Sequence, residues 1–360
     1  MSTDVERGGL EGVVAAHTVL SHADGENGIV WVRGHTIDDL VAHHGYEGTI
    51  ALMWEGFAGD GLTRASMTGQ LGAGRALAFS RLADWLPAAS RRAPIEAVRT
   101  ALAALPDDSP PAAIIAALPV AIAALLRTRA GQPPVPPDPA LATAADFLRM
   151  VNGAAVDPRV ATALDNYLTT VIDNGLGTST FAARVIISTR ASLASAALGA
   201  YGAFTGPLHG GAPGLALDML DEIAAAPDVD QWLDRTLAAG GRLMGFGHRV
   251  FRLRDPRADI LRAALQRLDP ASKRLAFARD VEQRAVAALQ RRKPGRRLEA
   301  NIEMDAALLL DAIGLPRDAF TPVFAIARAP AWIAHALEQQ RTGRMIRPAS
   351  SYVGPSPSVV

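Results

Sequence analysis

Apolar residues recur along most of this 360-residue chain at the three- and four-residue spacing of amphipathic helices, in segments separated by proline or glycine. Aromatic residues make up only 5% of the chain, while alanine and leucine are abundant, a balance that favours helix over strand. The pattern therefore predicts a mainly helical fold. The expected helices span residues 46–56, 69–86, 95–105, 112–130, 140–152, 161–174, 180–201, 212–226, 228–239, 257–268, 276–292, 304–313, 317–327 and 331–340.

The plausible strands lie in the first fifty residues. Residues Ile29–Val32 form a short apolar run that ends at Arg33-Gly34, a turn signal. A helix is expected to begin near Thr36, with Asp38 and Asp39 in its first turn. A small β-hairpin should therefore lead into the first helix.

Prolines and glycines set the breaks between the other segments. The proline-rich run at 132–139 predicts an extended surface loop, because proline denies the backbone both helical donors and helical dihedrals. The most apolar stretch, 112–126, is mostly alanine, short for a bilayer and cut by Pro119, so a buried or interface helix is expected and no membrane contact. Gly72-Ala-Gly74 lacks a third glycine at position 77, which gives no support for a dinucleotide-binding loop. The basic turn at 291–297 is interpreted as a solvated connection, with contact to coenzyme phosphates as the alternative.

Composition removes several classes of function. The formal net charge is zero and the basic residues are scattered, so no nucleic-acid partner is expected. The absence of cysteine excludes disulfides, zinc-thiolate sites and thiol nucleophiles. Residues Met1–Arg7 lack the apolar core of a signal peptide and include acids that a transit peptide avoids. These features favour a cytoplasmic enzyme.

Two histidines flanked by glycines are the strongest candidates for chemistry. His209 lies in Gly206-Pro-Leu-His-Gly-Gly211, and His248 ends Met244-Gly-Phe-Gly-His248. A carboxylate follows at Glu303 in Asn301-Ile-Glu303. Glycines let the backbone approach a ligand closely, so each turn is suited to holding its ring as a hydrogen-bond donor. This ordered set points to carbon–carbon bond chemistry on an acyl thioester.

The remaining histidines are interpreted as core or surface rings without a direct role. No His-x-x-x-His or His-plus-carboxylate cluster lies near His209 or His248, so we predict no metal ligand and no permanently bound cofactor. The six histidines interpreted as having no direct role are His17, His22, His35, His43, His44 and His335.

Motifs across nearly the whole chain resemble the citrate synthase family in order and spacing. The specific ones lie at 206–212, at 244–250 running into 255–257, at 324–328 and at 332–335. Weaker likeness extends to 9–13, 33–34 and 37–40 near the amino terminus, and to 346–348 and 352–355 near the carboxy terminus. The stretch from about 87 to 139 matches least.

The resemblance implies a role for each candidate catalytic residue. His209 would hydrogen-bond the carbonyl of acetyl-CoA and stabilise the enolate that forms from it. His248 would polarise the keto group of oxaloacetate. Glu303 would remove the methyl proton.

The resemblance also implies the binding residues. Arginine's planar fork suits bidentate recognition of carboxylates, and Arg257, Arg328 and Arg347 would hold oxaloacetate, with Arg347 reaching into the site of a partner subunit. Asn174 takes the place of a histidine that contacts oxaloacetate in many family members. For the coenzyme A thioester, which is a co-substrate, Arg252 would contact a phosphate. The backbone of Gly245, Phe246 and Gly247 would face the adenine side.

Two positions depart from the family pattern. Most members have aspartate where this chain has Glu303, so the base is one methylene longer; Asp305, the alternative base, should point about 200° away from Glu303 around the helix. Asn174 can donate a hydrogen bond but cannot carry charge. Together with the Tyr352–Pro355 ending, this pattern is similar to the secondary citrate synthases of bacteria.

The resemblance implies a two-domain helical homodimer that makes citrate and CoA from acetyl-CoA, oxaloacetate and water. The large domain would comprise 1–208 and 316–360, and the small domain 209–315 would close over the substrates. Two alternatives remain open. The first is 2-methylcitrate synthase or another acyl-CoA and keto-acid condensation, and the second is a catalytically weak paralogue that binds CoA or citrate as a sensor.

Overall fold

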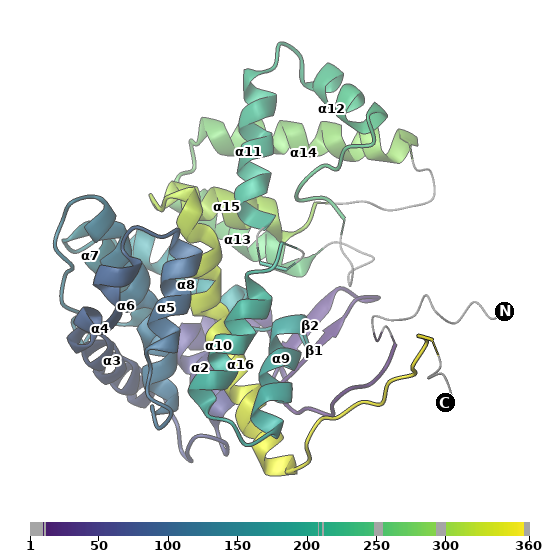
Figure 1. The fold of residues 1–360 in the computed structure, drawn as a ribbon. Helices are drawn as coiled ribbons and strands as arrows, with labels where there is room; N and C mark the ends of the chain where they lie inside the picture. The colour runs from purple at the N-terminus through teal and green to yellow at the C-terminus, as the bar shows by residue number, and fades with distance from the viewer. Residues whose placement is uncertain are drawn as a thin grey trace.

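The computed structural model describes residues 10, 12–207, 209–210, 212–247, 255–292 and 300–355. Helices dominate, and a small antiparallel sheet lies near the amino terminus (Figure 1). The strands are β1 (Ser21–Asp24), β2 (Ile29–Val32) and β3 (His35–Thr36). The α-helices are α1 (Ile37–Asp39), α2 (Gly45–Trp54), α3 (Arg64–Ser80), α4 (Leu82–Ala89), α5 (Pro94–Ala103), α6 (Pro111–Arg129), α7 (Thr143–Asn152), α8 (Pro158–Thr170), α9 (Thr178–Ser188), α10 (Leu193–Phe204), α11 (Ala212–Ala225), α12 (Val229–Ala238), α13 (Pro256–Leu268), α14 (Lys273–Arg292), α15 (Ile302–Ala312) and α16 (Phe320–Thr342). A π-helical turn, η2 (Leu40–His44), follows α1, and a 3-10 turn, η3 (Arg317–Ala319), precedes α16.

The amino-terminal sheet confirms the predicted hairpin and adds a third strand. β1 pairs with β2 so that Asp24 lies opposite Ile29, and β2 pairs with β3 so that Val32 lies opposite His35. The helix expected at Thr36 begins there, because the Thr36 hydroxyl accepts the backbone N–H of Asp39 as an N-cap.

Helix α6 forms the centre of the fold. It is one continuous helix, which confirms the single helix predicted over 112–130. The backbone hydrogen bond lost at Pro119 does not outweigh the burial of every residue from Ala112 to Leu125. Within the described part of the chain, α6 alone is long and apolar enough to suit a membrane span, and 72% of that window is buried inside the protein. α6 is therefore a core helix, as the sequence predicts.

Close packing against α6 and against the loop at 132–139 explains two glycines of α3. A Cβ at Gly74 would lie 2.9 Å from the carbonyl oxygen of Ala112, and one at Gly72 would lie 2.1 Å from that of Pro139. Both positions therefore exclude larger side chains. The extended loop predicted at 132–139 is confirmed. Gly72 lets this loop lie against α3.

Helix α16 corrects an expected break at proline. The sequence predicts two helices, 317–327 and 331–340, but α16 runs unbroken through Pro330. Proline cannot donate to the carbonyl four residues earlier, and here the Tyr46 hydroxyl donates to that oxygen of Ile326 at 2.6 Å. The Trp54 indole N–H bonds the Pro330 carbonyl at 3.0 Å. Side chains from α2 thus replace what the helix loses.

Two other segments are split where one helix was expected. Residues 180–201 form α9 and α10, because Arg190 takes a left-handed φ of 68° and the Ser192 hydroxyl caps the second helix by accepting the Ser195 N–H. Residues 69–86 are divided between α3 and α4, with the break at Arg81. The other expected helices are present with shifted ends.

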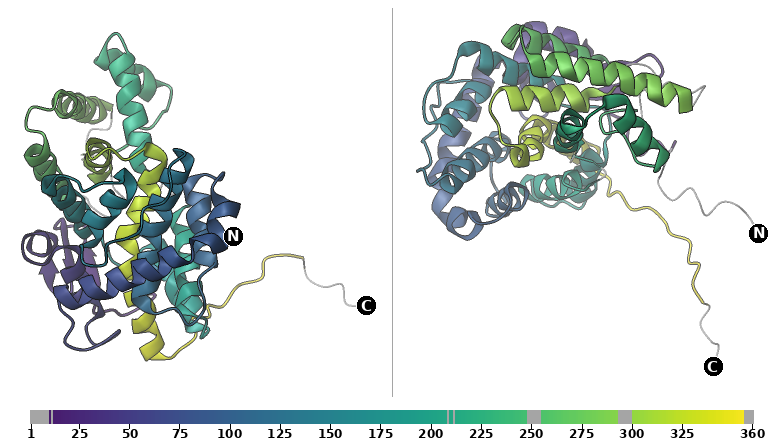
Figure 2. Two further views of the ribbon diagram at one scale, coloured as in Figure 1. Left: turned by 90° about the vertical axis from the view of Figure 1, so that its left-hand side faces the viewer. Right: turned by 90° about the horizontal axis from the view of Figure 1, so that it is seen from above.

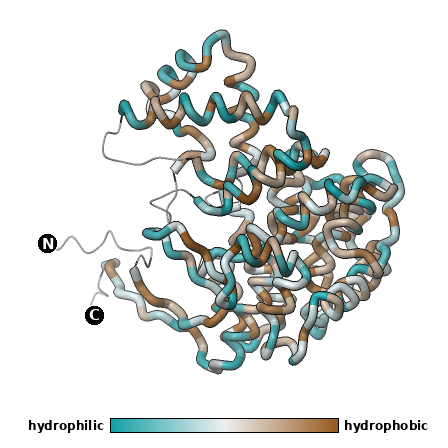
Figure 3. The backbone as a smooth tube through the Cα atoms, turned by 180° about the vertical axis from the view of Figure 1, so that it is seen from behind, coloured by the Kyte–Doolittle hydropathy of each residue, from teal (hydrophilic) through white to brown (hydrophobic). Residues whose placement is uncertain are grey.

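The helices fall into two groups in space. α11, α12 and α14 lie at one end of the molecule, at the top of Figure 1, with α13 and α15 beneath them. α2–α10 and α16 form the larger group below, and the chain after α16 extends away from it (Figure 2). Hydrophobic residues concentrate in the interior of the larger group, whereas α12 and α14 carry many hydrophilic positions (Figure 3).

Candidate functional site

His209 is held in the tight turn between α10 and α11. The backbone N–H of His209 donates to the Gly206 carbonyl at 2.9 Å, and the backbone N–H of Gly210 donates to the Phe204 carbonyl at 2.9 Å. A Cβ at Gly210 would approach that Phe204 oxygen to 2.6 Å, so only glycine fits this turn. The half-buried His209 ring lies edge-on to the Phe204 ring, with centroids 5.1 Å apart. The sequence prediction of a ring fixed by flanking glycines therefore matches the geometry.

Ser179, at the start of α9, determines how the His209 ring is protonated. The Trp332 indole N–H donates to the Ser179 hydroxyl oxygen at 3.1 Å, and the same hydroxyl lies 2.9 Å from His209 Nε2. The Ser179 backbone N–H also points at Nε2, at 3.4 Å. With Nε2 as the acceptor, the single proton of the neutral ring lies on Nδ1.

The electrostatics of His209 agree with a neutral ring. Burial, helped by the nearby positive charge of Arg328, lowers the pKa of His209 to about 4. The sequence motifs located His209 and Trp332 but gave no sign that Ser179 and Trp332 lie beside the His209 ring. Those two residues lie 30 and 123 positions away and meet the histidine only in the folded chain.

Arg328 is a buried cation in the middle of α16. Only 4% of the residue is exposed, its Nε donates to the Val171 carbonyl at 3.1 Å, and its guanidinium lies 5.2 Å from the centre of the Phe324 ring. Burial lowers its pKa to about 10, partly offset by the charge of Asp173. At neutral pH Arg328 therefore stays charged beside His209.

A buried network fixes the turn that carries Asn174. Asp173 accepts the Ser21 hydroxyl at 2.6 Å and the Asn174 N–H at 2.9 Å, and it pairs with His335 Nε2 at 3.0 Å. Charge and hydrogen bonds from His335 overcome burial and lower the pKa of Asp173. His335 also accepts from Arg184 at 2.8 Å, so its reading as a core ring with both nitrogens satisfied is confirmed.

The side-chain oxygen of Asn174 is the exception in this network. Oδ1 is buried and has no hydrogen-bond partner among the described residues. A buried amide oxygen without a partner is costly, and a rotated amide would present its NH2 donors at the same place. Asn174 therefore has hydrogen-bonding capacity left for a ligand.

Glu303 begins α15 beside the glycine turn of the predicted coenzyme site. The Asn301 side chain caps the helix by accepting the Glu303 N–H at 2.9 Å and donates to the Gly247 carbonyl at 2.9 Å. The Asn301 N–H bonds the Gly245 carbonyl at 2.9 Å, and Phe246 bridges to Ala300. Gly245 and Gly247 take φ of 80° and 78°, which favours glycine at both positions. Glu303 and the turn predicted to bind the coenzyme are thus one connected unit.

Burial shifts the proton affinity of Glu303. Desolvation raises the pKa of its carboxyl above the usual value, while a hydrogen bond to Asn301 and the charge of Arg257 oppose that shift. A carboxylate with raised pKa binds a proton more strongly, which suits a general base.

Arg257 lies at the start of α13 and is 4% exposed. Its Nε and Nη2 donate to the two oxygens of Asp255 at 2.9 Å and 2.8 Å, a bidentate pair. Arg257 interacts electrostatically with both Arg328 and Glu303. The four predicted residues His209, Arg328, Arg257 and Glu303 therefore form one electrostatic neighbourhood.

Asp305, the alternative base, is engaged elsewhere. It is fully buried, pairs with Arg279 and accepts from Arg262 at 3.3 Å. The predicted orientation away from Glu303 agrees with these ion pairs, which leave Asp305 no access to a substrate.

Comparison with known proteins identifies the family. Residues 9–349 match the family model described as citrate synthase, C-terminal domain. The chain is 38% identical to "Putative citrate synthase 2" of Mycobacterium tuberculosis, over 97% of this chain and 93% of the relative. It is 35% identical to the citrate synthase of Haloferax volcanii, over 98% of this chain and 97% of that protein. The chain belongs to the citrate synthase family.

A solved structure supports the same conclusion for the fold. The crystal structure of citrate synthase from Thermotoga maritima superimposes with a TM-score of 0.86 at 29% identity, covering 98% of this chain and 97% of that one. Membership confirms the mainly helical citrate synthase fold and the condensing acyltransferase class predicted from the sequence. The similarity extends over residues 87–139, which resembled the family least by motif.

Of the predicted site residues that the structure describes, Arg347 lies apart from this neighbourhood. His248 and Arg252 lie outside the described residues. Arg347 is exposed on the extended segment after α16, where the Ile346 N–H is anchored to Ser188 at 3.0 Å. Met345, Tyr352 and Val353 on the same segment are also exposed.

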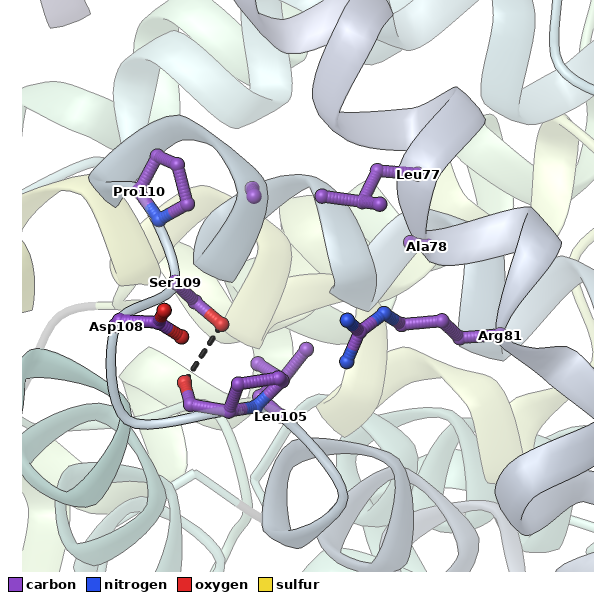
Figure 4. Close-up of a pocket in the computed structure, with 9 residues that line it drawn as sticks. Leu77, Ala78, Arg81, Leu105, Asp108, Ser109 and Pro110 are labelled. Carbon is purple, nitrogen blue, oxygen red and sulfur yellow. Dashed lines mark hydrogen bonds between the residues drawn. The ribbon is translucent and has the colours of Figure 1, made fainter.

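A surface pocket lies elsewhere, between α3 and the turn before α6 (Figure 4). Leu77, Arg81, Leu105 and Asp108 line it, and the Ser109 hydroxyl bonds the Pro106 carbonyl at 2.6 Å. None of the predicted site residues contributes to it, and it lacks a base paired with an oxyanion donor. The citrate synthase chemistry therefore does not belong to this pocket.

Proposed function

We propose that this protein is a citrate synthase that condenses acetyl-CoA with oxaloacetate and hydrolyses the resulting citryl-CoA to citrate and CoA. The observation that carries this proposal is the buried environment of His209, whose Nε2 lies against the Ser179 hydroxyl and backbone N–H. Its Nε2 receives hydrogen bonds from Ser179, and burial lowers its pKa to about 4, so Nδ1 bears the proton of a neutral ring. A preorganised neutral donor of this kind stabilises an enolate oxygen without giving up its proton.

Glu303 acts as the base in the proposed first step. Its carboxylate takes a proton from the methyl group of acetyl-CoA, and the electron pair moves onto the thioester oxygen, which accepts from His209 Nδ1. The raised pKa of Glu303 reduces the difference between its pKa and that of the weakly acidic methyl group, which makes the proton transfer less unfavourable. Glutamate is one methylene longer than the family's usual aspartate. If the α15 backbone lies correspondingly further from the substrate, the Glu303 carboxylate still reaches the methyl group, and the Asn301 cap holds that backbone in place.

The enolate carbon then attacks the keto carbon of oxaloacetate. His248 donates to the keto oxygen, which becomes the hydroxyl of citryl-CoA. Arg257 and Arg328 attract the two carboxylates, and Asn174 supplies a neutral hydrogen bond in place of the family's charged histidine. Water cleaves the thioester, releasing citrate and CoA.

The coenzyme binds at the turn formed by Gly245, Phe246 and Gly247, with Arg252 on a phosphate. We include in the proposal a small domain of residues 209–315 that closes on a large domain of 1–208 and 316–360. The separate group formed by α11–α15 supports this division. Closure would exclude water while the enolate exists.

We also propose a homodimer in which Arg347 completes the neighbouring subunit's site. Its support is the exposed carboxy-terminal segment, which extends away from its own chain and carries apolar side chains suited to a partner. We further propose that the enzyme acts in the cytoplasm and in the tricarboxylic acid cycle.

Release of CoA thiol, measured with acetyl-CoA and oxaloacetate and then with propionyl-CoA, tests the activity. Citrate formation with acetyl-CoA as the preferred thioester supports the proposal. Preference for propionyl-CoA would assign the protein to 2-methylcitrate synthesis instead. CoA binding without turnover for any acyl-CoA would identify a sensor and overturn the proposal.

A further inference from the structure

A cluster of histidine and carboxylate side chains lies outside the proposed active site, where the amino-terminal sheet meets the first helices. His35 is on β3, Asp39 ends α1 and His44 ends η2. One ligand atom from each residue lies within 4.8 Å of the others, and in the described part of the chain this is the group of three whose geometry could hold a metal ion. The three residues are partly exposed, so an ion can reach them from solvent.

The π-helical turn is what brings His44 to the cluster. In a straight α-helix a residue five positions after Asp39 would point about 140° away from it. In η2 the Gly45 N–H bonds the Leu40 carbonyl five residues earlier, so one turn takes an additional residue. His44 is thereby rotated towards His35, and the two rings meet edge-on with centroids 4.9 Å apart.

His43 supports the carboxylate from the other side. Its Nδ1 lies 2.9 Å from Asp39 Oδ1, whereas Asp39 Oδ2 pairs closely with His35 Nδ1. Contacts with the two histidines therefore orient the Asp39 carboxylate. A second partner on a ligating carboxylate is typical of metal sites.

We propose that His35, Asp39 and His44 bind a divalent transition metal ion of the zinc class. Two imidazole nitrogens and one carboxylate oxygen are ligands that Zn²⁺ accepts, with water in the fourth position. The ion replaces the proton between His35 and Asp39, and that proton is released to solvent. Ligand atoms of a tetrahedral zinc site lie about 3.4 Å apart, so small rotations of the partly exposed side chains complete it.

The role of this site is structural. The ion would join β3 to η2 and hold the amino-terminal sheet against the start of α2. The site revises the sequence expectation of no metal ligand, which considered only the surroundings of His209 and His248. It does not depend on the proposed citrate synthase activity, because none of its three ligands belongs to the catalytic neighbourhood.

Calorimetric titration of chelator-treated, tag-free protein with Zn²⁺ tests the proposal. One ion should bind per chain and raise Tm by roughly 3–5 °C when zinc is well above its dissociation constant. His35→Gln or His44→Gln should weaken binding by at least about a hundredfold and remove the Tm increment, and His43→Gln should weaken it by about tenfold. His22→Gln, on the neighbouring strand β1, is the matched control and should bind as the wild type does.

The measured increment in Tm, rather than Tm itself, separates metal binding from general destabilisation by a substitution. Circular dichroism of each variant without metal verifies its folding. Absence of stoichiometric zinc binding to the wild-type chain would overturn the proposal. Unchanged affinity in the His35→Gln/His44→Gln double variant would do the same, since the bound ion would then lie elsewhere.

Discussion

His209 and Glu303 are both withdrawn from water, and burial moves their proton affinities in opposite directions. The pKa of His209 falls to about 4, because burial disfavours the charged imidazolium. The pKa of Glu303 rises, because burial disfavours the charged carboxylate. One physical cause thus prepares a neutral hydrogen-bond donor on one side of the proposed acetyl site and a stronger base on the other.

The two regions differ in how they are built. His209 depends on distant partners, Ser179 at the start of α9 and Trp332 in α16. Glu303 has one local partner, the Asn301 cap, and that cap is bonded in turn to the Gly245–Gly247 turn, 56 to 58 positions earlier. Both residues therefore depend on tertiary packing, but only Glu303 also has a partner in its own helix terminus.

The largest effect is expected from removing the base. Glu303→Gln keeps the side-chain length but eliminates proton abstraction, so kcat should fall by about a thousandfold or more. Steady-state turnover with acetyl-CoA and oxaloacetate measures this loss. Asp305→Asn is an informative comparison, because turnover surviving in Glu303→Gln but lost in Asp305→Asn would transfer the role of base to Asp305.

Removal of the donor should cost nearly as much. His209→Ala is expected to lower kcat by about a hundredfold to a thousandfold, since the developing enolate charge loses its preorganised partner. Near-normal turnover in a folded His209→Ala protein would contradict the synthase assignment. Ser179→Ala leaves the His209 ring in place but no longer favours the tautomer protonated on Nδ1. An intermediate loss of about tenfold in kcat is therefore expected, with KM for acetyl-CoA little changed.

The length of the base gives the next effect. If the α15 backbone is set back for glutamate, Glu303→Asp should lower kcat by about tenfold to a hundredfold, because the shorter carboxylate falls short of the methyl proton by about 1 Å. A gain in turnover on this substitution would show that wild-type Glu303 is not a working base, as the sensor hypothesis requires. Kinetics with acetyl-CoA and propionyl-CoA provide the measurement.

Unlike His209 and Glu303, Arg347 on the exposed carboxy-terminal segment is proposed to act in the site of the partner subunit. Arg347→Ala and Glu303→Ala should each be inactive as homodimers. After subunit exchange, a mixed dimer has one site with both defects and one site with neither, so about a quarter of wild-type activity should return in an equal mixture. No recovery after exchange verified by native mass spectrometry would place Arg347 in its own subunit's site.

The smallest effect is on stability. Because the folded-state pKa of Glu303 lies above its unfolded value, the folded protein binds more protons, and the carboxyl's contribution to stability declines as pH rises through the folded pKa. Glu303→Gln removes that penalty and should raise Tm by about 1–2 °C at pH 8, with the difference shrinking towards pH 4. Thermal unfolding of both proteins at the two pH values measures it; a Tm below that of wild type at pH 8 would contradict the burial argument.

Much of the architecture follows from the sequence because its signals are local. Thr36 caps the first helix, Asp228 caps α12 and the proline-rich run stays extended, each determined by residues within a few positions. The glycines beside His209 and His248, together with the order of the motifs, identified the family. Local chemistry of this kind needs no folded context to be recognised.

Tertiary structure decided what depends on partners far along the chain. α16 passes through Pro330 because Tyr46 donates to the Ile326 carbonyl, and no local pattern could show that replacement. The proton on His209 Nδ1 depends on Ser179, and the inward rotation of His44 depends on the π-helical turn before Gly45. The sequence therefore determined which residues are candidates for the chemistry, whereas their orientation, partners and proton affinities were decided by burial and hydrogen bonds that exist only after distant segments have packed together.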